Sequence, residues 1–297
     1  MKRLSQVLRF VLLVLVTFPF ALLPYGIALR AGDVLGLLIF FFWRSRRTIA
    51  LDNLQGALDR GAITLSSSPR SVIRQNFKNL GKLIMEVIKI HYGFGNSIFR
   101  TVELKGAENF WKAHDKRRGV IILTGHCGNW ELLGVYLSLN LTKLKVVARK
   151  QNNEYINLFI EETREKYGNS VIYKAGALKK MVTSLKKNET VVILMDQSVI
   201  RSEGFVIPFL GKNAYVLKTP AIIARKTGTP IVPVFIRRTD NGHVIEIGEE
   251  ISLANAGDVE TAILHDTINL SRPIEEFIKK YPADWLWIHR RWKRSGK

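Results

Sequence analysis

The sequence is poor in cysteine, in acidic residues and in the short motifs that mark nucleotide and metal sites. Its 297 residues include one cysteine, Cys127, so no disulfide can form within the chain. The six histidines and the single cysteine form no cluster with the spacing of a zinc site. No glycine-rich phosphate-binding fingerprint is present either. We therefore expect no metal and no other cofactor.

The shortage of acidic residues leaves a large positive charge. Lys and Arg number 45 against 25 Asp and Glu, which gives a net charge of +20. Such a charge favours acidic partners: nucleic acid, anionic lipid, a phosphorylated substrate or an acidic carrier protein. Because 47% of the residues are hydrophobic, the chain can bury the core of one large domain or two small ones.

The N-terminal region is rich in hydrophobic residues. Twenty residues without a formal charge separate Arg9 from Arg30, about the length that a helix needs to cross a bilayer. Pro19 and Pro24 argue against one straight span, and a second apolar run occupies residues 34–43. We predict an uncleaved hydrophobic membrane anchor over residues 1–43 and a catalytic domain over residues 44–297. A signal peptide, a buried apolar helix and a helix lying in the membrane interface are the alternatives.

The rest of the chain alternates between short β-branched runs and helical patterns. Residues 48–90 read as helical, with a break near Ser66 to Pro69, where Ser68 is placed to cap the second helix. Farther on we expect strands at 119–124, 145–148, 171–173, 190–195, 231–237 and 243–247, and helices at 131–139, 153–167, 178–186, 219–227 and 259–280. This order predicts an α/β fold with a largely parallel central sheet flanked by helices.

The densest chemical signal is the run from Thr124 to Glu131, where a buried strand gives way to a helix. We predict that His126 is a general base at the strand end and that Glu131 orients its imidazole from the first helical turn. No serine or lysine nucleophile adjoins the pair, so direct transfer to a substrate hydroxyl is favoured, with a Cys127 thiolate as the alternative. In the simpler interpretation, His126 is a packed or surface residue and Glu131 only interacts with the helix N-terminus.

The same run resembles a known family. Gly125-His126-Cys127-Gly128-Asn129-Trp130-Glu131 is similar to the motif of bacterial lipid A biosynthesis acyltransferases, the late lauroyl and myristoyl transferases, within the glycerolipid and lysophospholipid acyltransferase superfamily. The resemblance continues in order through 147–149, 195–197, 204–211, 219–234 and 281–292, and thus covers nearly the whole chain. Two departures are Cys127, where an aromatic residue is commoner, and Ala-Arg-Lys at 148–150, where Tyr-Arg-Pro is frequent.

The resemblance implies an O-acyltransferase. The acceptor would be a hydroxyl of a lipid A precursor of the Kdo-lipid IVA type in lipopolysaccharide biosynthesis, and the donor an acyl thioester on acyl-carrier-protein, with acyl-CoA as the alternative. It also implies an enzyme of the bacterial inner membrane whose catalytic domain faces the cytoplasm. Related enzymes acylate mannosylated phosphatidylinositol, so another glycolipid or a lysophospholipid is an alternative acceptor.

Further residues are assigned to substrate binding. Arg149 and Arg164 suit phosphate groups of the acceptor, because guanidinium is a bidentate donor; a plain surface charge is the alternative. Asp196 and Gln197 follow the strand at 190–195, and Asp196 is expected to orient His126 or a hydroxyl, or else to cap a helix. Gly204 opens a segment, 204–211, interpreted as a wall over the acyl chain or as core. The tryptophans in 285–292 suit a membrane interface or ordinary aromatic packing.

Three other classes of protein compete with this interpretation. A nucleic-acid-binding protein would also be basic, but it would not need the uncharged N-terminal run, and no nucleic-acid-binding motif is recognisable, so we expect no nucleic-acid partner. A non-catalytic membrane scaffold would not depend on His126. An ester or thioester hydrolase would use the same pair with water as the acceptor. Membrane lipids, an acyl donor and a glycolipid acceptor are thus the partners that we expect.

Overall fold

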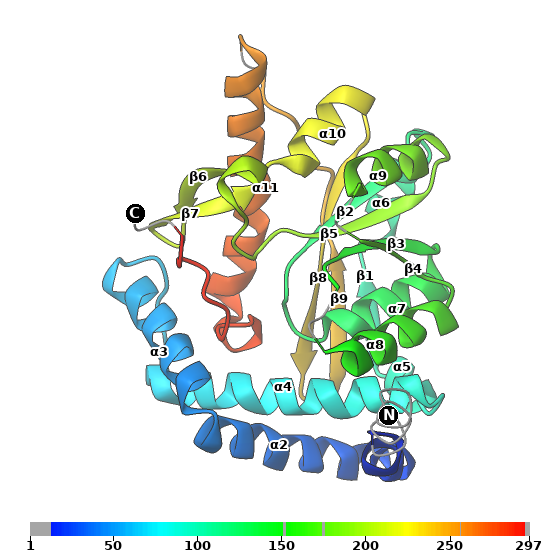
Figure 1. The fold of residues 1–297 in the computed structure, drawn as a ribbon, viewed down its shortest axis with the longest axis vertical. Coiled ribbons are helices and arrows are strands. Elements are labelled where there is room, and N and C mark those ends of the chain that lie inside the picture. The colour runs from blue at the N-terminus through cyan, green and yellow to red at the C-terminus, as the bar shows by residue number, and fades with distance from the viewer. Residues whose placement is uncertain (1–12, 151–152, 174–175, 256, 295–297) are drawn as a thin grey trace, which may run out of the picture.

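A seven-stranded sheet forms the centre of the molecule (Figure 1). The computed structural model describes residues 13–150, 153–173, 176–255 and 257–294. The strands are ordered β1-β9-β8-β2-β5-β3-β4 across the sheet. Their bounds are Val102–Lys105 (β1), Val120–Thr124 (β2), Leu144–Ala148 (β3), Ser170–Tyr173 (β4), Thr190–Leu194 (β5), Ile231–Thr239 (β8) and Gly242–Ile247 (β9). All neighbouring pairs are parallel except β8 and β9, so the predicted largely parallel sheet is confirmed.

Helices cover both faces of this sheet because both faces of its strands are apolar. Every residue of β2 is buried. Ile121 and Leu123 pack in one core cluster and Val120 and Ile122 in another, as the alternation of side chains along a strand requires. The first cluster contains side chains of α9 (Ala177–Lys186), α10 (Thr219–Thr227) and α11 (Val259–Lys280), and the second those of α6 (Ala107–His114) and α7 (Trp130–Asn140).

Two long helices lie side by side across the base of the molecule in Figure 1. They are α2 (Tyr25–Phe42) and α4 (Pro69–His91), and α3 (Arg44–Asp59) connects them. A methyl group added at Gly36 of α2 would lie 2.3 Å from the carbonyl oxygen of Phe77, and one added at Gly81 of α4 would lie 2.0 Å from that of Gly32. The glycines thus allow the two backbones to pack closely. As predicted, Ser68 caps α4 by accepting a hydrogen bond from Ser71 N.

The uncharged N-terminal run is divided differently from the prediction. A short helix over Leu13–Leu22 ends before Pro24, and α2 begins directly after that proline. The helix Tyr25–Phe42 therefore joins the end of the first apolar run to the second. By length and composition it is the one helix of the described residues that could cross a membrane. The predicted anchor residues 1–12 lie outside the described part.

Several elements had no clear pattern in the sequence. The strand β1, the helix α6 and the short helix α5 (Asn96–Phe99) all precede β2, and α5 lies near one end of α4 (Figure 1). The helix α8 (Glu154–Lys166), which lies near the same end of α4, agrees with the helix predicted at 153–167. Residues 204–217 form an antiparallel hairpin of β6 (Gly204–Phe209) and β7 (Lys212–Leu217). A side chain at Gly204 would come within 2.3 Å of Val216 O, so the hairpin pairing requires glycine at this position.

The C-terminal segment, residues 281–294, packs into the body of the protein. Trp285 and Trp287 are 1% and 0% exposed, so the expectation that these tryptophans face a membrane interface is wrong for both. Asn76 of α4 donates to the carbonyl oxygens of Ala283 and Trp285, and Asn53 of α3 donates to those of Trp287 and His289. The buried side-chain amides satisfy backbone groups that have no sheet or helix partner.

This segment contains a carboxyl group whose ionisation opposes folding. Burial raises the pKa of Asp284 to about 6, against 3.8 ordinarily. The folded state therefore gains stability as the pH falls from 6 toward 3.8, and at neutral pH it bears a cost of about 3 kcal/mol. We predict that Asp284→Asn, which keeps an acceptor for Asn79, raises the thermal unfolding midpoint at pH 8 and leaves it unchanged at pH 4. An equal rise at both pH values would contradict this explanation.

Candidate active site

The loop between β2 and α7 carries the predicted motif, and its shape depends on glycine. Gly128 has a positive φ of 53°, and a side chain there would lie 2.2 Å from Ile236 O. Asn129 then caps α7 by accepting a hydrogen bond from Leu132 N. The C-terminal segment holds the same loop, because Gly128 N donates to Asp284 O and Leu286 N donates to His126 O. The loop is thus fixed from both sides.

His126 lies at the carboxyl end of the sheet and contacts a buried carboxylate. Its Nδ1 is 2.8 Å from Oδ1 of Asp196, which follows the neighbouring strand β5. The histidine side chain is 21% exposed and that of Asp196 only 2%. A carboxylate at Nδ1 fixes the proton on that nitrogen and leaves the lone pair on Nε2. The imidazole can therefore accept a proton from a group that approaches from the exposed side.

The second oxygen of Asp196 is also satisfied. Trp285 Nε1 donates to Oδ2 over 2.9 Å. Burial alone would raise the pKa of Asp196, but His126 and the Trp285 indole outweigh it and hold this pKa well below its ordinary value. Asp196 is thus a carboxylate near neutral pH, and both of its oxygens have fixed partners. Of the roles expected for Asp196 from the sequence, the structure shows the contact with His126.

Gln197 and His289 complete the surroundings of the imidazole. Gln197 Nε2 is 3.3 Å from Nδ1 and 3.2 Å from Nε2 of His126, so the amide lies against the edge of the ring. His289 accepts a hydrogen bond from Ser198 N, and burial lowers its pKa to about 4. His289 is therefore neutral near pH 7 and adds no charge beside Asp196. Gln197 was predicted from the sequence to bind substrate, whereas His289 lies in the segment 285–292, for which only the tryptophans were interpreted.

Glu131 does not orient His126 as predicted. Its carboxylate accepts two hydrogen bonds from Arg164 of α8, over 2.7 Å to Nη2 and 3.0 Å to Nε. Burial would lower the pKa of Arg164, but Glu131 beside it raises this pKa above the ordinary value. The carboxylate beside the imidazole belongs to Asp196, so this part of the prediction is corrected. Glu131 and Arg164 form a bidentate ion pair in the turn next to His126.

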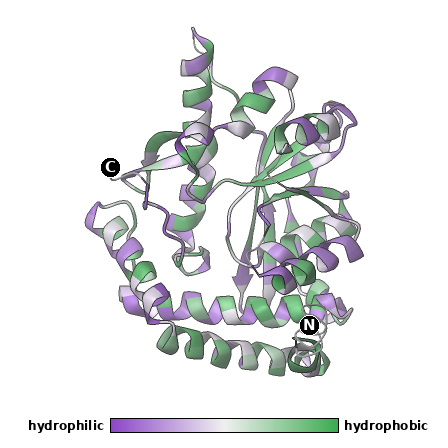
Figure 2. Ribbon diagram, viewed as in Figure 1, coloured by the Kyte–Doolittle hydropathy of each residue, from purple (hydrophilic) through white to green (hydrophobic). Residues whose placement is uncertain are grey.

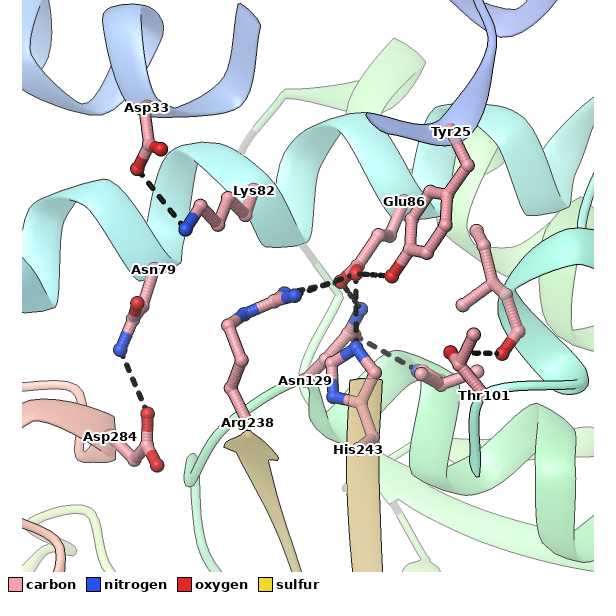
Figure 3. A network of polar contacts seen from close by, with 12 residues as sticks. Tyr25, Asp33, Asn79, Lys82, Glu86, Thr101, Asn129, Arg238, His243 and Asp284 are labelled. Atoms are coloured by element: carbon pink, nitrogen blue, oxygen red, sulfur yellow. Dashed lines mark hydrogen bonds and ion pairs between the residues drawn. The ribbon is translucent and has the colours of Figure 1, made fainter. Parts of the chain in front are cut away.

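A second network holds the motif loop against α4 (Figure 3). The fully buried carboxylate of Glu86, on α4, accepts hydrogen bonds from Asn129 Nδ2, from both terminal nitrogens of Arg238 and from Tyr25 OH at the start of α2. His243 Nε2 lies 2.9 Å from the same carboxylate. Burial would raise the pKa of Glu86, but Arg238 and His243 lower it far below its ordinary value. The amide that caps α7 is therefore held at both ends.

The remaining candidates lie apart from the imidazole or have a packing explanation. Arg149 directly follows β3 and is exposed. Gly204 belongs to the β6–β7 hairpin, and its substrate-binding role stays a prediction. Cys127 is 1% exposed, and burial raises the pKa of its thiol well above the ordinary value, which opposes a thiolate intermediate. In the part of the chain that the structure describes, no three His, Cys, Asp or Glu side chains are grouped as metal ligands.

The arrangement as a whole is typical of a general base. An imidazole with a carboxylate on one nitrogen and a side chain that is partly open to solvent can deprotonate a hydroxyl group or a water molecule near pH 7. Its pairing with Asp196, which Trp285 in turn holds in place, fixes the orientation of the ring before a substrate binds. The buried thiol of Cys127 leaves the motif without an activated nucleophile of its own, which favours direct attack by a substrate.

The chain is similar to known proteins over most of its length. The family model described as bacterial lipid A biosynthesis acyltransferase matches residues 2–294. A lipid A biosynthesis palmitoleoyltransferase of Escherichia coli is 24% identical over 274 residues, which cover 91% of this chain and 86% of that protein. A phosphatidylinositol mannoside acyltransferase of Mycolicibacterium smegmatis is 25% identical over 228 residues, 75% of this chain and 73% of that protein. A solved 1-acyl-sn-glycerophosphate acyltransferase of Thermotoga maritima aligns with 84% of this chain and 97% of that chain, at 18% identity and a TM-score of 0.38.

Proposed function

Because the chain belongs to the bacterial lipid A biosynthesis acyltransferase family, we propose that it transfers a fatty acyl chain from acyl-carrier-protein to a hydroxyl group of a lipid A precursor of the Kdo-lipid IVA type. The observation that carries the proposed reaction is the contact of 2.8 Å between His126 Nδ1 and Asp196 Oδ1, with the imidazole still 21% exposed. Membership of this family makes the protein an acyltransferase. The identities of the acyl donor and of the acceptor lipid are what we propose.

In the proposed reaction the acceptor hydroxyl attacks the thioester directly. Its oxygen bonds to the carbonyl carbon while Nε2 of His126 takes the hydroxyl proton, and Asp196 stabilises the imidazolium that forms. The tetrahedral intermediate then collapses. The C–S bond breaks, the thiolate leaves with the bonding pair and the imidazolium returns its proton to the sulfur. No acyl-enzyme is needed, in agreement with the buried, protonated Cys127.

Glu131 retains a catalytic role in this proposal, but through Arg164. The ion pair fixes the first turn of α7, which begins at Trp130. The ring of Trp130 lies edge-on to the His126 imidazole, with 5.1 Å between the ring centroids. We propose that the pair holds this side of the site in place, with Arg164, Arg149, Gln197 and Gly204 lining the path of the substrates. The side chain of Arg164 is 16% exposed and remains accessible to an anionic group.

A second acceptor is supported by a specific observation. The phosphatidylinositol mannoside acyltransferase matches 75% of this chain, so a mannosylated phosphatidylinositol is the alternative acceptor. Acyl-CoA is the alternative donor. The net charge of +20 favours acyl-carrier-protein, if that carrier is acidic, because encounter between opposite charges is accelerated.

We also propose that α2 anchors the enzyme to the cytoplasmic face of the bacterial inner membrane. Figure 2 shows α2 as hydrophobic along most of its length, whereas α4 beside it alternates. The outer side of α2 exposes Ile27, Val34, Leu38, Phe41 and Phe42, and Trp43, directly after the helix, is exposed as well. On its inner side Asp33 forms ion pairs with Lys78 and Lys82 of α4, and these charges would be costly to carry into a hydrocarbon core. A helix lying in the interface therefore fits better than a spanning one.

Product analysis with a panel of acceptors tests the proposal. The purified full chain is mixed with acyl-carrier-protein or CoA thioesters of one labelled fatty acid and with a tetra-acylated, Kdo-bearing lipid A precursor, a mannosylated phosphatidylinositol or a lysophospholipid. We expect the lipid A precursor to gain one acyl chain at the highest kcat/KM and with the carrier protein as the better donor. Faster acylation of the mannolipid or the lysophospholipid would replace the proposed acceptor, and no acylated lipid would refute the function.

A further inference from the structure

A polar cleft of about 770 Å³ lies next to the motif loop and has no part in the reaction described above. It is bounded by α4, the start of α2, the β8–β9 turn and the end of α11. Figure 3 shows its inner part, where Asn79 and Lys82 extend from α4, Arg238 from β8 and Asp284 from the opposite side. His126, Asp196 and Gln197 are not among the residues that line it.

The lining determines what the cleft can hold. Most of its side chains are hydroxyl, amide or charged groups, so burial of an acyl chain there would leave polar groups without partners. Gln75 and Asn79 are hydrogen-bonded to each other, whereas Ser66, Asp240 and Asn241 offer donors and acceptors of the kind that bind sugar hydroxyls. At the rim, α11 ends in Lys279 and Lys280, both exposed and neither in a salt bridge among the described residues. Lys280 Nζ lies over the Tyr281 ring, which also lines the cleft, and ammonium groups at the rim suit a phosphate.

The position of the cleft indicates where its ligand comes from. Tyr25 and Leu29 of α2 form part of its wall, so it lies beside the helix with the exposed apolar side. It also adjoins the loop that carries His126. Asp284, a lining residue, accepts the hydrogen bond from Gly128 N, and the lining residue Arg238 contacts Glu86, which holds Asn129. A headgroup in the cleft is thus close both to the expected lipid surface and to the catalytic loop.

We infer that this cleft binds the phosphorylated sugar headgroup of the acceptor lipid, with Lys279 and Lys280 on its phosphate. The inference rests on the proposed function, since it takes the acceptor to be a phosphorylated glycolipid, and it adds a headgroup site separate from His126. A phosphate held here keeps the acceptor at the protein surface while its hydroxyl reaches the imidazole. The site therefore contributes to acceptor affinity and not to the chemical step.

Removal of the two charges tests the inference. In Lys279→Gln/Lys280→Gln we expect the KM for the acceptor to rise about tenfold, with kcat and the donor KM unchanged, because the lost contacts are equally strong in the ground and transition states. The matched control is Lys186→Gln/Lys187→Gln, which removes two exposed lysines from the C-terminal end of α9. An unchanged acceptor KM, a fall in kcat instead, or the same change in the control would overturn the inference.

A binding measurement separates the acceptor from bulk anionic lipid and does not require turnover. Wild type and both variants are sedimented with phosphatidylcholine vesicles that contain either the phosphorylated glycolipid acceptor or an equal charge of phosphatidylglycerol. We expect Lys279→Gln/Lys280→Gln to weaken binding to the glycolipid vesicles only. Equal weakening on both vesicles would assign the lysines to general membrane attraction and overturn the inference. If wild type transfers no acyl chain to any lipid, the proposed function fails, while this binding difference still decides the headgroup site.

Discussion

Replacement of His126 by alanine is expected to lower kcat for acyl transfer by about 10⁴-fold, the largest effect of any single substitution in the site. The variant loses the one group placed to take the proton from the acceptor hydroxyl, and a hydroxyl group ionises far above neutral pH. Since the His126 side chain is 21% exposed and its backbone contact with Leu286 N does not depend on the imidazole, the fold is expected to persist. Initial rates at saturating donor and acceptor measure the effect.

The control for this variant is His265→Ala. His265 is an exposed histidine of α11, so its loss removes the same side chain from a surface helix. We expect wild-type kcat for it. A His126→Ala variant that is folded, binds the acceptor and retains more than about a tenth of wild-type kcat would refute the role of general base.

Replacement of Asp196 by asparagine is expected to lower kcat by about 10³-fold with little change in either KM. The amide still accepts the hydrogen bond from Trp285 Nε1. Its NH2 group then faces His126 Nδ1, and so the side chain no longer stabilises the imidazolium that forms during transfer. The loss of a buried charge that fixes the imidazole therefore acts on the chemical step and not on substrate binding.

A second buried carboxylate separates this effect from a general loss of stability. Asp266 of α11 is 1% exposed and is paired with Arg225 of α10, and neither residue contacts the motif loop. Asp266→Asn is expected to lower the unfolding midpoint while kcat of the folded enzyme stays near the wild-type value. If both asparagine variants lost kcat in proportion to their loss of stability, Asp196 would contribute only to folding. Its contact with His126 would then not assist acyl transfer.

The sheet and most helices could be predicted from the sequence because their patterns are local. The run at 190–195 is apolar and β-branched, so it predicts a strand whichever strands lie beside it in the sheet. The helix α11 was predicted with the bounds that the structure has, Val259–Lys280. The boundary of α2 was missed because hydrophobicity alone does not show that Pro24 starts a helix instead of interrupting one. The strand β1 was missed because it is short and only its alternate residues, Val102 and Leu104, are partly buried.

The sequence allowed us to predict the site residues that lie together in one motif, but not which distant residues contact them. His126 and Glu131 stand five positions apart, and their common motif made a direct contact the simplest expectation. Their partners come instead from distant segments, Asp196 from the end of β5 and Arg164 from α8. Which carboxylate reaches the imidazole depends on β5 lying next to β2 in the sheet, and one sequence does not state that order.

The role of the C-terminal tryptophans was missed for a similar reason. Indoles among cations are typical of a membrane interface, and composition alone does not separate that setting from packing in a core. Trp285 is buried because its backbone pairs with Cys127 in an isolated bridge and its indole donates to Asp196. Both contacts join residues more than 80 positions apart, and no local pattern contains them. The one sequence signal was the density of aromatic residues beside a histidine and an aspartate.

The most direct test of acyl transfer follows both halves of the reaction in one tube. Loss of the acyl-carrier-protein thioester and gain of the labelled acyl chain by the phosphorylated glycolipid are measured together, with and without that acceptor. Our account predicts one acylated lipid for each thioester consumed, and almost no thioester loss when the acceptor is omitted. Free fatty acid released at the same rate with and without the acceptor would make water the true acceptor, and the protein a thioesterase.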